Sequence, residues 1–442
     1  MTTILFGKES DCEENPGGHD LRATLVPGDV RAYLAAGFDV VVQQGIGRGV
    51  GYLDVQYERA GARVESFPGC YAGKDIVVRL KGPAPDEIAE LTPGTVLFSM
   101  GHLYCFPERE RQLAAKGVRL IGMESIKRPA EPTAPYVAGL RAGARADRLL
   151  LADATEVHLD RSVDQDFVNG LLRALMRLGG RPVTVRPLEG SPAPAAGPAP
   201  AAGLSVTRTG TYLYTADGEL VDLDEPSAEA DPRADRLHAD ELRRSVRAIG
   251  RLREVGVGGA TYGIDLYRGL HAGSDPRAVV LGYGNVAMGA FAHLCGAGVE
   301  FTVLGRRQTS PEELPRWLRT AGLVVNGAER EDGGFLLTDE QVDLHLRERS
   351  VVIDLIGGSP QQRSPVEAFQ WTTFLPDIHF ESNGRYFAGL WGWDMYHSMH
   401  ESACAYSAMI KAVLLGEADY AVSVDRFLAD FSHAQKVGAV RV

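Results

Sequence analysis

A short apolar run in the second half of the chain breaks into closely spaced glycines and then resumes with the pattern of a helix. The run covers residues 278–281, and Gly282 and Gly284 follow it. Such a turn binds a pyrophosphate when its first glycine permits the bend and its second lets backbone N–H groups approach the ligand. A small residue at Ala287 lets helix and strand pack closely. The predicted dinucleotide-binding positions are Gly282, Gly284, Asn285, Val286 and Ala287.

The residues after the next predicted strand indicate which dinucleotide would bind. Residues 300–304 have a strand pattern about 20 residues downstream, at the offset where such a unit contacts the adenosine ribose. Arg306 and Arg307 follow this strand, where a carboxylate would otherwise bind a ribose 2′-hydroxyl. Two guanidinium groups bind a phosphate through charge-assisted, forked hydrogen bonds, so NADP(H) is favoured over NAD(H). The alternative is a glycine turn without a ligand, next to a solvated arginine loop.

Composition limits the classes of partner. The 442 residues are enough for about two or three domains with buried cores. The net charge is −12 and the basic residues form no sustained run, which argues against a nucleic acid or an anionic membrane as partner. The first residues lack a signal-peptide pattern and no apolar stretch approaches 18 residues, so we expect a cytoplasmic protein.

Cysteine and histidine spacing gives little support to a metal site. The five cysteines are scattered, odd in number and without C-x-x-C spacing, which argues against a disulfide framework or zinc. His397, His400 and Glu401 would share one helix face, but their spacing matches no established zinc helix. A polar helix start is the better interpretation, and we expect no metal.

Strand and helix patterns alternate along the first 125 residues. This alternation predicts a parallel, doubly wound sheet covered by helices. Chemistry in such sheets gathers beyond the carboxyl ends of the strands, where Lys81, His102 and Glu124 stand. Asn326 and Asp354 end later predicted strands and would border the nicotinamide half of a cofactor. The predicted fold class is α/β, with two Rossmann-like doubly wound parallel-sheet domains and an inserted subdomain.

The predicted domain order is discontinuous. Residues 1–130 and 386–442 would form a substrate domain, and residues 246–385 an NADP-binding Rossmann domain. Residues 131–245 form an insert whose Pro/Ala-rich stretch 191–203 cannot bury enough apolar surface for a core and is typical of a linker.

Five short segments of the N-terminal half carry a resemblance to a known family. They occupy residues 21–27, 45–54, 76–83, 97–102 and 122–124. In order and spacing they resemble the N-terminal domain of the alanine dehydrogenase and pyridine-nucleotide transhydrogenase family. The resemblance covers roughly residues 1–128 and 242–415 and leaves the middle insert unexplained.

Two narrower groups are also similar. Residues 282–291 and 324–327 resemble carboxyethylornithine synthase, which reductively joins a keto acid to the side-chain amine of an amino acid. Residues 102–104, with Glu124 and Asp394, resemble the lysine-forming saccharopine dehydrogenases. Both act on a C–N bond between an amine and a keto acid. The resemblance therefore implies an NADPH-dependent reduction of the imine formed from an α-keto acid and an amino acid or amine.

The resemblance also assigns roles to individual residues. Arg22 would bind the keto-acid carboxylate, Lys81 would polarise its carbonyl, and His102 would be the general acid and base. Glu124 and Asp394 would bind the ammonium group of the substrate. The implied partners are a small keto acid and an amino acid or amine, with a homo-oligomer as a possible assembly.

Departures from the family pattern keep other functions open. Alanine dehydrogenases carry a second aspartate soon after the one matching Asp354 and an Asn-Met-Pro near the returning segment, whereas residues 355–358 and 393–396 differ here. This difference argues against simple alanine deamination. An oxidatively deaminating amino-acid dehydrogenase is the alternative enzyme. A catalytically silent dinucleotide-binding regulator is the alternative from another class. Trp391 and Trp393 fit either a pocket or a core.

Overall fold

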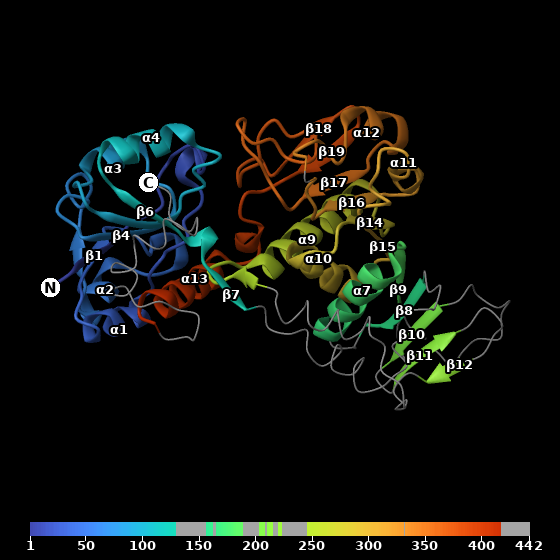
Figure 1. Ribbon diagram of the computed structural model, residues 1–442, viewed down its shortest axis with the longest axis horizontal. Coiled ribbons are helices and arrows are strands. Elements are labelled where there is room, and N and C mark those ends of the chain that lie inside the picture. The colour runs from blue at the N-terminus through green and yellow to red at the C-terminus, as the bar shows by residue number, and fades with distance from the viewer. Residues whose placement is uncertain are drawn as a thin grey trace.

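Two β-sheets with helices on their faces dominate the computed structural model (Figure 1). The structure describes residues 1–129, 156–161, 165–188, 203–207, 210–214, 220–222, 245–330 and 332–416. Between the two sheets, β7 (Lys127–Pro129) and β13 (Ser245–Arg247) form a short antiparallel pair. The predicted α/β class with two doubly wound sheets is confirmed.

The first sheet is parallel throughout, in the order β3-β2-β1-β4-β5-β6. Its strands are β1 (Thr3–Phe6), β2 (Asp39–Gln43), β3 (Arg63–Glu65), β4 (Ile76–Lys81), β5 (Val96–Met100) and β6 (Arg119–Gly122). The central strands are buried on both faces, as expected when helices cover a parallel sheet. The strand order reverses between β1 and β4, and ligands bind beyond such a reversal.

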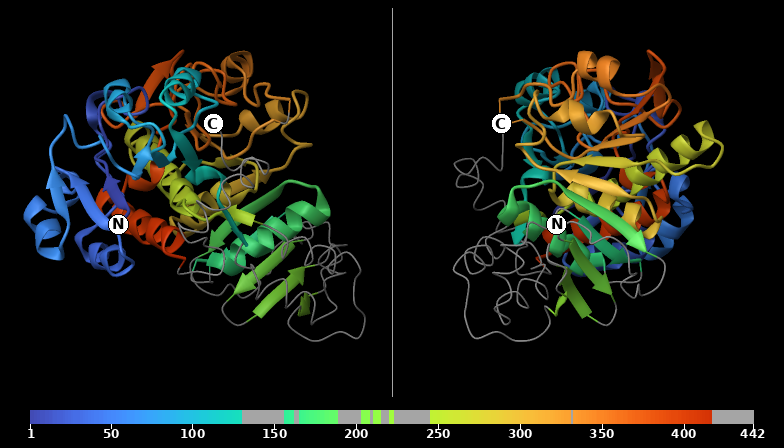
Figure 2. Two further views of the ribbon diagram at one scale, coloured as in Figure 1. Left: turned by 60° about the vertical axis from the view of Figure 1, so that its left-hand side comes forward. Right: turned by 90° about the vertical axis from the view of Figure 1, so that its right-hand side faces the viewer.

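Helices from both halves of the chain cover this sheet (Figure 2). The helices that lie between strands of this sheet in the chain are α1 (Val30–Ala35), α2 (Asp54–Ala60), α3 (Pro85–Glu90) and α4 (Pro107–Ala115). The helix α13 (Met399–Leu414) returns from the second domain, and its Ala403, Tyr406 and Ile410 pack into one core with Ile4 and Val40. The first domain therefore contains residues from both ends of the described chain.

The second sheet runs in the order β12-β11-β10-β8-β9-β15-β14-β16-β17-β19-β18. Its later strands are β14 (Ala278–Leu281), β15 (Phe301–Leu304), β16 (Leu323–Asn326), β17 (Val351–Asp354), β18 (His379–Ser382) and β19 (Arg385–Ala388). The neighbouring strands β15, β14, β16, β17 and β19 are parallel, and the strand order reverses between β14 and β16. Since β19 pairs with β17, this sheet extends past residue 385, where the predicted boundary lies.

Four of the described helices that accompany the second sheet follow the insert in the chain. They are α9 (Leu252–Leu270), α10 (Asn285–Gly296), α11 (Leu314–Leu318) and α12 (Asp339–His345). Bare backbone lets α9 and α10 approach closely: a Cβ on Gly289 would collide with the carbonyl oxygen of Arg253, and one on Gly256 with that of Val286. No helix in the described ranges is long and apolar enough to cross a membrane.

The described part of the insert joins the second sheet. Its elements are β8 (Glu156–Asp160), α7 (Gln165–Gly179), β9 (Val183–Leu188), β10 (Gly203–Thr207), β11 (Gly210–Tyr214) and β12 (Leu220–Asp222). Strand β9 pairs antiparallel with β15, and α7 buries Val168, Leu171 and Leu172 in the same core as Phe291. Except for Gly203, the predicted linker 191–203 lies outside the described residues.

Candidate active site

The predicted strand, turn and helix start is present at the glycine motif. Strand β14 ends at Leu281 and α10 begins at Asn285. Gly282 has a φ of 91°, and a Cβ there would lie 2.7 Å from the Cβ of Ala328. Ala287 is fully buried and packs against Gly327. A Cβ added to Gly327 would lie 3.1 Å from the Cβ of Ala287. Only glycine fits the bend at Gly282, because the left-handed conformation and the close approach both exclude a side chain.

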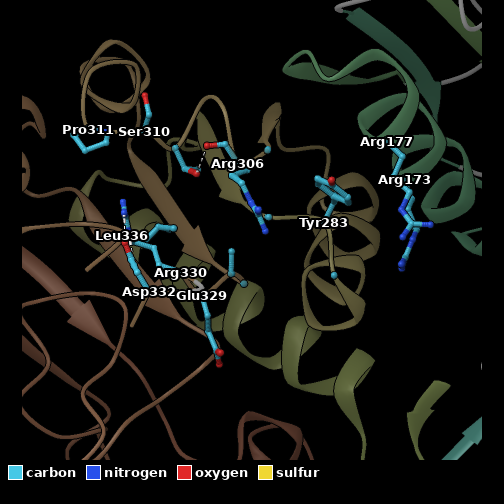
Figure 3. Close-up of a pocket in the computed structure, with 16 residues that line it drawn as sticks. Arg173, Arg177, Tyr283, Arg306, Ser310, Pro311, Glu329, Arg330, Asp332 and Leu336 are labelled. Carbon is cyan, nitrogen blue, oxygen red and sulfur yellow. Dashed lines mark hydrogen bonds and ion pairs between the residues drawn. The ribbon is translucent and has the colours of Figure 1, made fainter. Parts of the chain in front are cut away.

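A cavity of about 700 Å³ opens at this turn (Figure 3). Gly282, Gly284, Gly305 and Gly327 expose backbone along it, which is the surface that a dinucleotide requires. Arginine side chains also line it, and they are Arg173, Arg177, Arg306 and Arg330. The bare backbone and the guanidinium groups together fit an anionic dinucleotide.

The other predicted cofactor residues differ in position. Asn285 and Val286 form the first turn of α10. Arg306 lines the cavity, whereas the exposed Arg307 is not among the described residues that do. Of the two predicted guanidinium groups, Arg306 is therefore the one placed to contact a ligand.

Asn326 and Asp354 are fully buried and bind each other, with the amide Nδ2 donating to Oδ1 at 2.9 Å. Asp354 also accepts hydrogen bonds from Ser364 Oγ and from the backbone N–H groups of Ile356 and Gly357. Burial raises the pKa of Asp354, although these donors oppose the effect. Neither side chain is among the described residues lining the two cavities; instead they hold the loops that do.

A second cavity of about 650 Å³ lies between the two domains. His102 and Tyr104 line it from the first domain, while Gly357 and Trp391 line it from the second. The Trp391 ring centroid lies 5.3 Å from that of His102 and stacks on Phe106 at 5.9 Å. Glu329 and Arg330 line both cavities, so the two are adjacent there.

His102 sits in an unusual backbone conformation at the edge of this second cavity. Its φ is 45°, a left-handed value that few residues other than glycine adopt. The backbone N–H of His102 donates a hydrogen bond to Oε1 of Glu124 at 3.2 Å, which stabilises the turn at His102. The imidazole Nδ1 of His102 is buried without a hydrogen-bond partner in the described structure and lies 3.7 Å from Oε2 of Glu14.

Glu14 is completely buried behind His102. Arg109 binds its Oε1 and also donates to the carbonyl oxygen of Gly101 at 2.9 Å. Burial acts to raise the pKa of Glu14, but Arg109 and His102 outweigh it and hold that pKa below its usual value. Glu14 is therefore a carboxylate. A Cβ on Gly82 would collide with the Arg109 guanidinium, which explains why glycine follows Lys81.

Lys81 and Arg22 belong to the same buried network as Glu14. The Nζ of Lys81 donates to the carbonyl oxygen of Glu14 at 2.7 Å and lies 3.2 Å from Oδ2 of Asp20. Arg22 binds Asp20 through Nε and Nη2, and binds both carboxylate oxygens of Asp394 through Nη1. Burial opposes ionisation of Asp20, but Arg22 and Lys81 lower the pKa of that carboxyl below its usual range.

This geometry differs from the substrate contacts predicted for Arg22 and Asp394. Each is at most 5% exposed, and each satisfies the charge of the other. Ser402 Oγ also donates to Asp394 at 2.5 Å. With their charges already paired inside the protein, these two groups join the 3₁₀ helix η5 (Trp393–Met395) and α13 to the first domain.

The histidines of the H-x-x-H-E run make protein contacts. His397 Nε2 pairs with Thr261 Oγ1 at 3.0 Å, and His400 Nδ1 lies 2.6 Å from the carbonyl oxygen of Val50. Within the described ranges no group of three His, Cys, Asp or Glu side chains is placed to hold a metal ion. The two tryptophans differ in position: Trp391 lines the second cavity, while Trp393 is 1% exposed in the core.

Residues 12–138 match the family model described as "Alanine dehydrogenase/PNT, N-terminal domain". The match includes Glu14, Lys81, His102 and Glu124, which the geometry brings together. The N-terminal part of this chain is therefore similar to the N-terminal domain of the alanine dehydrogenase/PNT family.

Curated relatives match over a stretch of similar length. The alanine dehydrogenase of Bacillus subtilis is 35% identical over 123 residues, which is 28% of this chain and 32% of that protein. The alanine dehydrogenase of Halomonas elongata is 32% identical over 112 residues, covering 25% and 30%. The NAD(P) transhydrogenase subunit alpha of Haemophilus influenzae is 27% identical over 125 residues, covering 28% and 23%. The matched part of the chain thus spans about a third or less of these relatives.

Solved structures extend the likeness to the whole fold. An L-alanine dehydrogenase superposes with a TM-score of 0.55 at 15% identity, covering 100% of this chain and 95% of that one. A transhydrogenase from Sinorhizobium meliloti superposes with a TM-score of 0.50 at 16% identity, covering 95% of each. At such identities the likeness concerns the arrangement of two Rossmann-like domains.

Three residues of the alanine dehydrogenase/PNT-type domain escaped prediction. Arg109 is remote in sequence from Glu14 and Asp20, and none of the three ends a strand. A signal existed for Asp20, because a carboxylate two residues before Arg22 is placed to bind it. For Glu14 and Arg109 the sequence offers no local pattern, since α4 and the loop after β1 meet only in three dimensions.

Proposed function

We propose that this chain is a pyridine-nucleotide-dependent oxidoreductase that acts on the C–N bond of an amino acid. In its finer form, the proposal is an NADPH-dependent reduction of the imine formed between an α-keto acid and an amino acid or amine. The observation that carries it is the position of His102. A buried imidazole backed by Glu14 borders a cavity that shares Glu329 and Arg330 as lining residues with the glycine-lined one.

The proposed reaction is a condensation followed by a reduction. The keto acid and the amine condense with loss of one water, forming a C=N bond. Bound NADPH would supply the hydride that adds to the imine carbon, and one proton goes to the nitrogen. The products are a secondary amine and NADP⁺, and each turnover consumes one proton from solution. The protein must therefore supply a group that exchanges protons, a cation for the carboxylate or carbonyl oxygen, and a dry cavity.

His102 is the proposed general acid and base. Glu14, held as a carboxylate by Arg109, faces Nδ1 of the imidazole. A carboxylate at this nitrogen stabilises the imidazolium and leaves Nε2 to exchange a proton with the carbinolamine or imine nitrogen. Lys81 is the proposed cation for the substrate carbonyl, through displacement of its contact with the Glu14 carbonyl oxygen.

The remaining predicted substrate residues have different proposed roles. Glu124 has one carboxylate oxygen on the His102 backbone, while its Oε2 is buried without a hydrogen-bond partner in the described structure. That oxygen is the proposed acceptor for the substrate ammonium group. Arg22 and Asp394 are proposed as positioning residues, because their charges are already paired. In this proposal residues 1–130 with the returning C-terminal segment hold the substrate, and residues 246–385 hold the cofactor.

An oxidatively deaminating amino-acid dehydrogenase is the second candidate. It is supported by the two alanine dehydrogenases among the relatives described above. A catalytically silent regulator that binds a dinucleotide is the third candidate, and it requires the glycine-lined cavity alone.

One experiment separates the three candidates. Purified protein is mixed with NADPH or NADH, a panel of α-keto acids, and either ammonia or a panel of amino acids and amines, while absorbance at the nicotinamide band is followed. Oxidation that requires an amino acid or amine supports the imine reductase. Oxidation with ammonia alone supports the deaminating dehydrogenase and rejects the finer proposal. Binding without oxidation in any combination rejects both enzyme functions.

A further inference from the structure

The inserted segment supplies part of the glycine-lined cavity. We propose that Arg177 of α7, together with Arg306, recognises the 2′-phosphate of NADP(H), so that the insert determines cofactor preference. The inference rests on the proposed function for the identity of the ligand. The resemblance of the chain to its family leaves the insert without a role, and this assignment gives one to its first helix.

The insert occupies a defined place in the second sheet. In the first sheet β3 pairs with β2 in the strand order β3-β2-β1-β4. In the second sheet the equivalent order is β9-β15-β14-β16, so β9 takes the place of a third strand. Because β9 comes from the insert and runs antiparallel to β15, the helix beside it is α7. The insert thereby places α7 beside the carboxyl end of β15.

Two contacts fix α7 at the residue where the adenosine ribose would lie. A Cβ on Gly305 would lie 3.2 Å from Cε of Met176, so that α7 side chain rests on the bare backbone at the end of β15. Gln308 ties the same point to the end of α7: its Nε2 donates to the carbonyl oxygen of Gly180 at 3.0 Å, and its Oε1 accepts from the Gly305 N–H at 3.1 Å. Arg177 is the residue after Met176.

The charge around this point is positive. Arg173 and Arg177, one helical turn apart on α7, line the cavity together with Arg306 (Figure 3). Arg330, which pairs with Asp332 at 2.6 Å, and Glu329 also line the cavity. Guanidinium groups from α7 and from the loop after β15 thus line one cavity. A phosphate dianion next to a ribose is the part of NADP(H) that NAD(H) lacks, and forked guanidinium groups recognise it.

The position along the dinucleotide favours the 2′-phosphate over the pyrophosphate. A pyrophosphate lies against the glycine turn and the start of α10, whereas the adenosine ribose lies at the end of the second strand of the unit. Met176 and Gln308 anchor the end of α7 at that second location. Arg306 follows Gly305 directly, and Tyr283 lies between Arg306 and the two arginines of α7 (Figure 3).

Direct binding of cofactors tests the inference without relying on catalysis. The variants are Arg177→Gln, Arg306→Gln and, as a matched control, Arg319→Gln, an exposed arginine of the same domain that is not among the described cavity residues. Each full-length variant is titrated with NADPH, NADH and 2′,5′-ADP by calorimetry. We expect Arg177→Gln and Arg306→Gln to weaken NADPH and 2′,5′-ADP about tenfold or more and NADH less than about twofold. Arg319→Gln should change none of them.

Other outcomes overturn the inference in identifiable ways. Equal losses for NADPH and NADH in Arg177→Gln would place that arginine at the pyrophosphate. Unchanged NADPH binding in Arg177→Gln would remove α7 from the site. Tighter binding of NADH than NADPH by the wild-type protein would reject the 2′-phosphate assignment and still leave an oxidoreductase function intact. Conversely, selective NADPH binding without turnover on any substrate panel would reject the proposed function and sustain this inference.

Discussion

At the scale of single residues, the first domain concentrates buried charge around His102 and Lys81. The carboxylates of Glu14 and Asp20 are each neutralised by a guanidinium group, Arg109 for the former and Arg22 for the latter. Charges taken out of water are stable only when they are paired and hydrogen-bonded in this way. The consequence is a buried, charge-paired network next to His102, which lines the cavity between the domains.

Replacement of His102 by alanine should abolish turnover and leave NADPH binding unchanged. The imidazole is the proposed proton-exchanging group, while the described cofactor cavity does not include it. General acid and base groups contribute about 10²–10⁴-fold, so the rate should fall by at least that factor. Steady-state rates and NADPH titrations of the same preparation provide the check. Normal turnover in this variant would remove His102 from the mechanism.

Glu9 predicts a pH dependence of stability. It is buried in the loop after β1, where its oxygens accept hydrogen bonds from the backbone N–H groups of Leu80 and Lys81. Burial raises the pKa of Glu9 to about 7. A carboxyl with a raised pKa in the folded state binds its proton more tightly there than in the unfolded chain, whose usual value is 4.5. Its stabilising contribution is complete below pH 4.5 and is lost as the pH rises to about 7.

The substitution Glu9→Gln isolates this effect. Between pH 4.5 and 7 the wild-type protein should lose up to about 3 kcal/mol of unfolding free energy relative to the variant, because the amide does not ionise. Urea unfolding of both proteins at pH 5 and pH 8 measures the difference. An identical pH dependence of the two proteins would contradict a protonated Glu9.

At the scale of elements, the cofactor cavity depends on how closely α9 and α10 approach. Gly256 of α9 packs against the backbone of α10, and Gly289 of α10 packs against the backbone of α9. This contact positions the first turn of α10 next to the bend at Gly282. Ala287 and Gly327 form a second close contact between this helix and the loop after β16. Small residues at these points set the position of the N–H groups that would face a pyrophosphate.

The substitution Gly289→Ala should destabilise the protein and weaken cofactor binding. Its Cβ would collide with the carbonyl oxygen of Arg253 and force α9 and α10 apart, at a cost of about 1–3 kcal/mol. Gly296→Ala on the same helix is the matched control, since nothing lies within 4 Å of its added Cβ. That control should be neutral or stabilising by up to about 1 kcal/mol. Thermal unfolding and NADPH titration of both variants measure these effects, and equal behaviour of the two would refute the contact.

At the scale of the whole molecule, the two domains are joined through the returning C-terminal segment. Trp393 donates from Nε1 to the carbonyl oxygen of Asp354 in the second domain, while its neighbour Asp394 binds Arg22 in the first. On the cavity side, Trp391 contacts the ring of His102. A single stretch of chain thus holds both halves of the proposed site together.

The substitution Arg22→Met should destabilise the molecule by about 3–5 kcal/mol, since it leaves Asp20 and Asp394 as buried carboxylates without their guanidinium partner. Arg63→Met is the matched control. Arg63 also bridges two carboxylates in the first domain, Asp39 and Glu65, but its side chain is 54% exposed, so the loss should stay below about 1 kcal/mol. Urea unfolding of both variants gives the comparison. An unchanged stability in Arg22→Met, together with a raised KM for the keto acid, would restore the substrate contact first expected of Arg22.

Much of this molecule follows from local sequence patterns, for a physical reason. The strands near residues 278, 301, 323 and 351 and the glycine turn are set by periodic burial and by backbone conformations that only glycine adopts readily, and both are legible over a few residues. The ends of β4, β5 and β6 likewise bring Lys81, His102 and Glu124 to one edge, because parallel strands share a direction.

The tertiary structure decided what those side chains contact. Arg22 and Asp394 are 372 residues apart, and only the return of α13 onto the first sheet pairs their charges inside the protein. Glu14 reaches His102 because Arg109 of α4 compensates its burial, and Arg177 reaches the cavity because β9 takes a strand position beside β15. Ion pairing and cavity lining depend on distances between segments that are remote in the chain, and such distances leave no periodic trace in sequence.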